Sequence, residues 1–267
     1  MYTKLISSSQ NPLIKHIIGL TDKAKERRTH GLFVVEGMRE IQLAVASKFA
    51  VTTLVCCPEI IDQSALELLL KTLNSELERV EVSTEVYEKI AYRGSTEGVL
   101  ALCRIQNHTL DTLHFHSKHP LILVAEAPEK PGNIGALLRT CDAAGVDAVI
   151  IANPKTDLYN PNIIRSSVGA LFTTQIRTGT TQEIIDYLKA QGVSIYCASL
   201  QAALPYTSVN LSGPAAIVVG TEADGLSEAW TEQSDQNIII PMNGQLDSMN
   251  VSVAAGILIF EAIRQKA

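Results

Sequence analysis

Residues 217–226 read Ile-Val-Val-Gly-Thr-Glu-Ala-Asp-Gly-Leu, an apolar run that ends in a glycine, a carboxylate and a second glycine. This order predicts a buried strand that leads through a tight turn into a helix. At that position an α/β sheet exposes backbone N–H groups and short side chains to a ligand. A plain strand-to-helix turn capped by Asp224 or Ser227 would read similarly, so both interpretations stay open for this stretch alone.

A second stretch, residues 133–140, reads Asn-Ile-Gly-Ala-Leu-Leu-Arg-Thr and follows a turn with prolines at 128 and 131. Asn133 is predicted to cap a helix over residues 134–144, and Gly135 permits a close approach. Arg139, one turn further on, would reach the same cleft. A capped helix with a solvated arginine explains these residues equally well.

A third stretch, residues 238–254, reads Ile-Ile-Ile-Pro-Met-Asn-Gly-Gln-Leu-Asp-Ser-Met-Asn-Val-Ser-Val-Ala. A helix needs one small polar cap, for which Ser248 serves, yet Ser248, Asn250 and Ser252 occur together before an apolar helix. Because capping does not require so many polar groups, we interpret them as part of a functional site. All three stretches link a predicted strand to a predicted helix, which indicates one composite site.

The C-terminal part alternates apolar strands with helical segments. We expect six strands, at residues 121–125, 148–151, 173–176, 193–198, 215–219 and 237–240. Helices are expected at 134–144, 162–170, 182–190 and 226–232, with a last helix from 251 to 263. This alternation predicts an α/β domain with a mainly parallel six-stranded sheet covered on both faces.

The N-terminal part predicts a separate small α/β domain over residues 1–106. Its first helix should run from Pro12 to about Arg28, because Asn11-Pro12 is a typical start. Further helices are expected at 38–47 and 65–73, and strands at 32–35, 53–57, near 80 and at 99–105. Residues 107–119 lose apolar periodicity and form the predicted linker, so the second domain covers 120–267.

Composition excludes several classes of protein. The net charge of −6 argues against a uniformly basic nucleic-acid binder, but residues 1–50 carry eight Lys/Arg against four Asp/Glu and could contact phosphates. The chain shows no membrane-spanning run and no secretory signal, so the cytoplasm is expected. Neither G-x-G-x-x-G nor G-x-x-x-x-G-K-[ST] occurs, so NAD-type and P-loop chemistry lack their usual support.

The cysteines and histidines give no sign of a metal site. The cysteines are odd in number and mostly lie in apolar runs, which predicts buried, reduced thiols. Four histidines gather near the linker, but their spacing fits no standard zinc pattern, and we expect no metal. These residues are Cys56, Cys57, Cys103, Cys141, Cys197, His108, His114, His116 and His119.

The order and spacing of the three stretches resemble the three motifs of the SpoU (TrmH-like) ribose 2'-O-methyltransferases of the SPOUT superfamily. The resemblance spans about residues 121–265 and includes residues 159–161 and 165–169. It extends, less specifically, to residues 7–11, to Arg27 and Arg28, and to residues 33–37. That part is similar to the substrate-binding domain of members that modify ribosomal RNA, a domain resembling ribosomal RNA-binding proteins.

The resemblance implies a fold and a cofactor that periodicity does not show. The fold is a sheet with a deep trefoil knot, and the cofactor is S-adenosylmethionine, held largely by main-chain groups. Met249 stands where the family usually has leucine, a change of similar volume. The implied cofactor-binding residues are Ala198, Ser199, Leu200, Gly220, Ile240, Met242 and Met249.

The resemblance also implies the catalytic residues. Arg139 is the catalytic arginine of the family, sometimes described as a base. Because a guanidinium has a pKa above about 12, we interpret Arg139 as a fork that holds an RNA phosphate and stabilises negative charge on the 2'-oxygen. Asn133 and Glu222 would orient Arg139 and the ribose, and Ser248 and Asn250 would complete the polar wall.

The implied partners are structured RNA and a second copy of the chain. Ribosomal RNA, of the large subunit, is favoured over transfer RNA because of the N-terminal domain. Arg27, Arg28 and Arg165 are the predicted RNA contacts, although each could be a solvated helix residue. Two other functions stay open: a catalytically silent RNA-binding or ribosome-assembly factor, and a nucleotide-binding metabolic enzyme.

Overall fold

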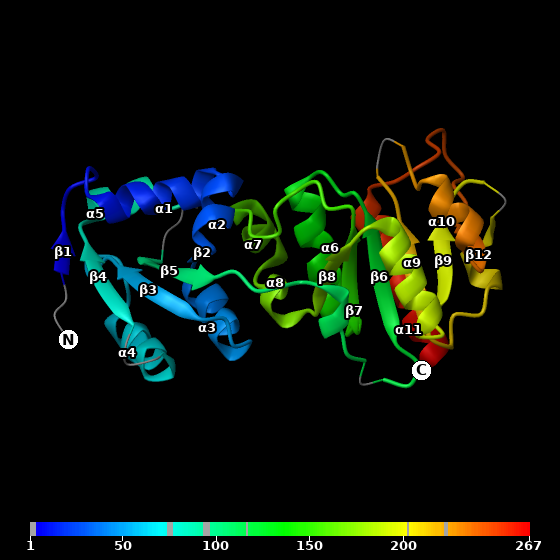
Figure 1. The fold of residues 1–267 in the computed structure, drawn as a ribbon, viewed down its shortest axis with the longest axis horizontal. Coiled ribbons are helices and arrows are strands. Elements are labelled where there is room, and N and C mark those ends of the chain that lie inside the picture. The colour runs from blue at the N-terminus through cyan, green and yellow to red at the C-terminus, as the bar shows by residue number, and fades with distance from the viewer. Residues whose placement is uncertain (1–3, 74–76, 93–96, 116, 202, 222–223) are drawn as a thin grey trace. The chain divides into compact units, whose positions relative to one another are not determined.

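The computed structural model describes residues 4–73, 77–92, 97–115, 117–201, 203–221 and 224–267. It divides into two units. Figure 1 colours the chain from blue at the N-terminus to red at the C-terminus. The N-terminal unit comprises residues 1–107 and 157–173, and the C-terminal unit comprises residues 108–156 and 174–267. Each unit has its own sheet.

The N-terminal unit is built on a five-stranded mixed sheet in the order β1-β4-β3-β5-β2. β1, β4 and β3 run parallel, whereas β5 is antiparallel to both β3 and β2. The strands are β1 (Lys4–Ile6), β2 (Leu32–Glu36), β3 (Val51–Cys56), β4 (Glu78–Val82) and β5 (Val99–Arg104). The helices are α1 (Pro12–Asp22), α2 (Ala24–His30), α3 (Met38–Ala46), α4 (Gln63–Thr72), α5 (Thr84–Ile90), α7 (Pro161–Ser167) and α8 (Ala170–Thr173).

The first helix differs from its prediction. The expected single helix is interrupted at Lys23, whose backbone is extended, so α1 and α2 are separate. Asn11 caps α1 as predicted, since its Oδ1 accepts a hydrogen bond from the N–H of Leu13 at 2.9 Å. β1 and α5 were not predicted, because a three-residue strand and a seven-residue helix carry little periodicity.

The structure corrects the assignment of Arg27 as an RNA contact. Its side chain is buried, and its guanidinium is used inside the N-terminal unit. Nε donates to Oδ2 of Asp157 at 2.5 Å, while Nη1 donates to the carbonyls of Leu20 and Thr21 at 2.6 and 2.9 Å. These carbonyls belong to the last turn of α1, where helical acceptors lack intrahelical partners. Arg28, the next residue, is exposed, and its RNA contact stays a prediction.

Residues 157–173 group with the N-terminal unit and not with the unit in which the sequence analysis placed them. Aromatic packing accompanies the Arg27–Asp157 pair: the ring of Tyr159 lies 4.1 Å from that of Phe33, centroid to centroid. The ring of Phe172 lies 5.2 Å from that of Phe49. The segment is therefore part of the N-terminal core, although it follows β7 in the chain.

The C-terminal unit is a seven-stranded sheet in the order β10-β12-β9-β11-β6-β7-β8, and every strand pair that the structure describes in it is parallel. The strands are β6 (Leu121–Glu126), β7 (Ala148–Ala152), β8 (Ile176–Gly179), β9 (Ser194–Ala198), β10 (Leu204–Pro205), β11 (Ala215–Val219) and β12 (Gln236–Ile239). Six strands were predicted; the seventh, β10, is a two-residue edge strand. The expected strand at 173–176 begins only at Ile176, because the preceding residues form α8.

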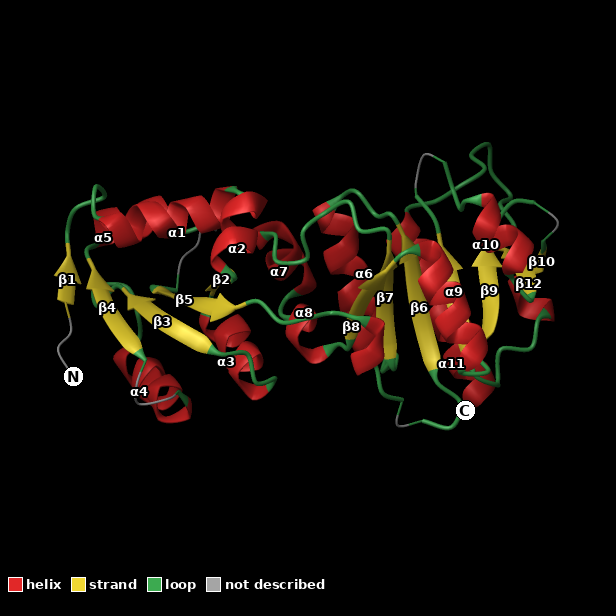
Figure 2. Ribbon diagram, in the orientation of Figure 1, coloured by secondary structure: helices red, strands yellow, loops and turns green. Residues whose placement is uncertain are grey.

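Helices cover both faces of this sheet. They are α6 (Pro131–Ala144), α9 (Thr181–Ala190), α10 (Glu228–Gln233) and α11 (Val251–Lys266). Alternate strand residues pack with α9 and with Trp230 of α10 on one face. α6 and α11 pack on each other and on the sheet, and Figure 2 shows α9 in front of the strands and α11 behind them.

The predicted buried thiols are confirmed. All five cysteines are buried and unbonded to one another. Burial raises the pKa of the thiols of Cys103, Cys141 and Cys197 to about 12, so they stay protonated at neutral pH. The described residues contain no group of three or more His, Cys, Asp or Glu that could hold a metal ion. No helix among them is long and apolar enough to cross a bilayer.

The Arg27–Asp157 pair should matter for stability. Asp157→Asn keeps the shape of the side chain but leaves a buried guanidinium without its counter-charge, so the free energy of unfolding should fall by about 3 kcal/mol. Urea unfolding followed by circular dichroism measures this. Glu26→Gln, which removes the more exposed pair with His30, should change it by less than about 1 kcal/mol. Equal effects of the two substitutions would contradict the anchoring role of Arg27.

Candidate active site

The carboxyl ends of three neighbouring strands meet at one edge of the C-terminal sheet. β9 lies between β12 and β11, and all three are parallel. Ala198 is in register with Ile238, and Cys197 with Val218. The predicted positions Ala198, Gly220 and Ile240 are therefore brought to the same edge, and the N–H of Ser199 donates to the carbonyl of Ile238 at 3.0 Å.

The turn after β11 is tightly closed. Thr221 and Gly225 exchange backbone hydrogen bonds, at 2.9 and 3.2 Å, and Gly225 has a φ of 69°. A Cβ at Gly220 would lie 2.2 Å from the carbonyl group of Gly225, so only glycine fits there. Glu222, the predicted catalytic carboxylate of this turn, lies outside the described residues.

Glu126 is a residue of this edge that sequence reasoning missed. It ends β6 and is 6% exposed. Its carboxylate accepts hydrogen bonds from the N–H and the hydroxyl of Ser227, both at 2.8 Å, and from the hydroxyl of Thr181 at 3.1 Å. Glu126 thus holds the end of the turn after β11 and the start of α9. The sequence did contain a signal for this residue, since Glu126 is a carboxylate at the end of an otherwise apolar strand.

The start of α11 brings two predicted catalytic residues together. Asn250, and not Ser248, is the N-cap: its Oδ1 accepts from the N–H and the hydroxyl of Ser252, at 3.0 and 2.6 Å. Its Nδ2 donates to Oδ1 of Asn133 at 3.3 Å. The predicted approach of Asn133 and Asn250 is therefore confirmed.

Asn133 does not cap α6 as predicted. The helix begins at Pro131, with Lys130 as its N-cap, because proline suits the first helical position. Asn133 is the third residue of the helix, and its side chain bonds across to Asn250. The helix thus begins three residues earlier than predicted, and Asn133 lies within it as a residue of the site and not as its cap.

Asn133 and Gly220 line a hollow of about 580 Å³, its open mouth included. Ala125, Leu137 and Val251 give it apolar walls, whereas Glu129, Lys130 and Asp224 are charged. At the rim, Nζ of Lys155 donates to Oε1 of Glu129 at 2.7 Å. This hydrogen bond lowers the pKa of the Glu129 carboxyl, which is ionised at neutral pH. The hollow thus joins a glycine-lined edge to the amide of Asn133, which Asn250 contacts from outside the lining.

Other predicted residues do not line this hollow. Arg139 is exposed on α6. Since a helix turns about 100° per residue, Arg139 lies about 120° around α6 from Asn133. Arg165 belongs to the N-terminal unit. The remaining predicted residues outside the hollow's lining are Ala198, Ser199, Leu200, Ile240, Met242, Ser248, Met249 and Asn250.

Comparisons with known proteins match both parts of the chain. The family model of the SpoU rRNA Methylase family matches residues 120–260, and that of the MRM3-like substrate binding domain matches residues 11–101. The chain therefore belongs to the SpoU rRNA methylase family.

Some relatives are similar along nearly their whole lengths. The 23S rRNA (guanosine(2553)-2'-O)-methyltransferase RlmP of Bacillus subtilis is 30% identical, over 96% of this chain and 98% of the relative. A crystal structure of an RNA 2'-O ribose methyltransferase has a TM-score of 0.84 at 37% identity, covering 98% and 99% of the two chains. An AdoMet-bound rRNA methyltransferase from Sinorhizobium meliloti has a TM-score of 0.91 at 26% identity, covering 99% of each chain.

Gly220 should tolerate no side chain. Gly220→Ala places a methyl group against the backbone of Gly225, so the turn must shift, and the free energy of unfolding should fall by about 1–3 kcal/mol. Thermal unfolding and hydrogen exchange of residues 215–230 measure this. Gly213→Ala is the matched control, because its Cβ would meet no atom within 4 Å. Unchanged amide hydrogen exchange in Gly220→Ala would show that the turn can accommodate a methyl group, which would contradict this prediction.

Proposed function

We propose that this chain transfers a methyl group from S-adenosylmethionine to a ribose 2'-hydroxyl of ribosomal RNA, with the large-subunit RNA as substrate. The observation that carries the proposal is the contact of Asn133 with Asn250 beside the hollow at Gly220. The family match over both units supports it, as do relatives named as 23S rRNA methyltransferases. A cytoplasmic location would follow from such a substrate.

The strand edge suits the cofactor. When bound, S-adenosylmethionine supplies a methyl group carried on a positively charged sulfur. Main-chain groups of Gly220, Ile240 and Met249 would hold it, with Ala198 to Leu200 and Met242 beside them. The fit is supported by Gly220, where any side chain would collide with the turn, and by the ends of parallel strands, which present unpaired backbone groups.

The side chains around the hollow would orient the ribose. The amides of Asn133 and Asn250 offer donors and acceptors to a hydroxyl, and Glu222 and Ser248 would complete the polar wall. Arg139 is exposed and, among the described residues, forms no hydrogen bond or ion pair. Its protonated guanidinium would hold an RNA phosphate and stabilise the negative charge that develops on the 2'-oxygen.

A second copy of the chain would complete the site. On α11, Val253 and Phe260 are 53% and 52% exposed, and their spacing of seven residues puts both on one face. α11 packs against α6, which carries the exposed Arg139. A homodimer formed through this face would cover the apolar side chains and direct Arg139 towards the hollow of the partner. Arg165 would serve as a further RNA contact.

The trefoil knot is part of this proposal. The order of the sheet inserts β11 between β9 and β6 and places β12 beyond β9. α11 then returns to contact β6, β11 and α6. Such a return of the chain end across earlier strands supports the knot that the family resemblance implies.

Arg139→Ala tests the catalytic role. Removal of one charge-stabilising donor should lower methyl transfer to ribosomal RNA about 100-fold or more, while binding of S-adenosylmethionine, measured by calorimetry, stays within about two-fold. Arg104→Ala, at another exposed arginine, is the control and should retain activity. Loss of cofactor binding with normal turnover of the bound complex would overturn the role of Arg139.

Phe260→Asp tests the dimer. A charge in the centre of a buried apolar face should convert the dimer to a monomer in sedimentation experiments and abolish methyl transfer, because Arg139 would then lack a partner's hollow. Leu68→Asp on α4, where the leucine is 61% exposed, provides the control. A Phe260→Asp protein that stays dimeric would rule out this face.

A further inference from the structure

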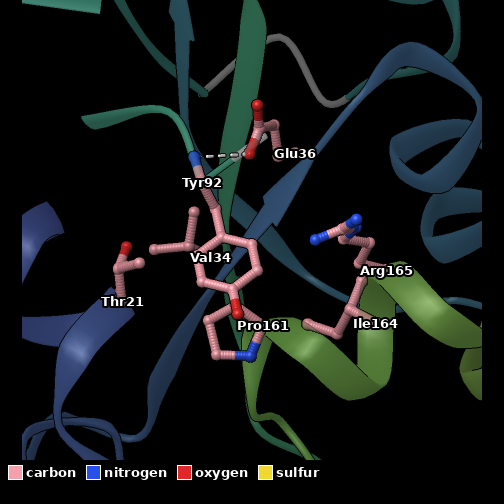
Figure 3. A pocket seen from close by; sticks show the side chains of 7 residues that line it. All are labelled: Thr21, Val34, Glu36, Tyr92, Pro161, Ile164 and Arg165. Atoms are coloured by element: carbon pink, nitrogen blue, oxygen red, sulfur yellow. Dashed lines mark hydrogen bonds between the residues drawn. The ribbon is translucent and has the colours of Figure 1, made fainter. Parts of the chain in front are cut away.

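The N-terminal unit contains a second hollow, which is shallow and open to solvent. Its apolar part comes from Val34 on β2 and from Pro161 and Ile164 on α7 (Figure 3). The two elements are more than a hundred residues apart in sequence. The hollow therefore exists only because residues 157–173 pack into this unit.

Tyr92 lies in the middle of the residues that line this hollow (Figure 3). Tyr92 is 44% exposed, so part of its ring is open to solvent. The backbone at Tyr92 is held in place, because its N–H donates to Oε2 of Glu36 at 2.8 Å and Glu36 is 8% exposed. An exposed aromatic ring on a fixed stretch of backbone is suited to stacking on another planar ring.

Arg165 stands at the side of the same hollow. It is exposed on α7, its guanidinium points towards Tyr92 in Figure 3, and its side chain forms no hydrogen bond or ion pair with the described residues. The hollow therefore offers two groups to a ligand: the guanidinium of Arg165 can bind a phosphate, and the ring of Tyr92 can stack on a base.

Arg27 holds the walls of the hollow in place. It binds the carbonyl of Thr21, which lines the hollow from α1, and the carboxylate of Asp157, which precedes α7. Arg27 is thus a positioning residue for this hollow and not itself a contact. Residues 1–50 carry more Lys/Arg than Asp/Glu, and this positive charge favours a ligand that is part of a polyanion.

We propose that this hollow binds one unpaired nucleotide of the RNA substrate, with its base stacked on Tyr92 and its phosphate on Arg165. The proposal rests on the proposed function, since it assumes that the chain binds RNA. The hollow is shallow, so the base would stack on the exposed ring of Tyr92 at its mouth. Such stacking needs a base that is free of its pair, so RNA loops are preferred over duplexes.

The test measures RNA binding by the full-length protein without cofactor. One probe is an RNA hairpin with 2-aminopurine in its loop, and the other is a blunt duplex of the same stem. The wild type should bind the hairpin more tightly and change the 2-aminopurine fluorescence. Tyr92→Ala should weaken hairpin binding about ten-fold or more and remove the fluorescence change, whereas Tyr92→Phe should retain both.

Further arms separate the possible outcomes. Arg165→Ala should weaken binding and reduce its salt dependence, and Leu68→Ala, at an exposed apolar residue of the same unit, should have no effect. Equal hairpin binding by the wild type and Tyr92→Ala would overturn the nucleotide site and leave the proposed function standing. A wild type that binds neither RNA would overturn both. Displacement of the hairpin by free mononucleotides would show that the hollow serves a free nucleotide.

Discussion

The buried carboxylate of Glu126 is the constraint on which the candidate active site depends. A charge in the interior is costly unless hydrogen bonds compensate it, and here Ser227 and Thr181 supply three. These bonds join the end of β6 to the turn after β11 and to the start of α9. The buried carboxylate of Glu126 therefore fixes the sheet edge at which Gly220 lines the hollow.

The N-terminal unit uses a comparable device. Arg27 is a buried guanidinium with three acceptors, and it joins the end of α1 to a segment that follows β7 in the chain. In both units a buried charge holds a functional segment at a fixed place. The consequence in the N-terminal unit is a hollow with Tyr92 and Arg165 at its opening.

The site within one chain offers amides and a glycine-lined edge, while Arg139, the proposed catalytic cation, lies elsewhere on α6. This separation fits an enzyme whose active site is completed by a second copy. The exposed apolar face of α11 beside α6 supplies a physical reason for that association, since burial of Val253 and Phe260 would be favourable.

The sequence by itself determined the alternation of strands and helices, the parallel C-terminal sheet, the buried thiols and the gathering of polar stretches at one edge of the sheet. These features follow from local periodicity and from the rule that parallel strands end at one edge. Tertiary structure alone decided the burial of Arg27, the cap at Asn250 and the grouping of residues 157–173 with the N-terminal unit. The partners Arg27 and Asp157 are 130 residues apart, and no local pattern reports a contact over that distance, because it depends on the path of the whole chain.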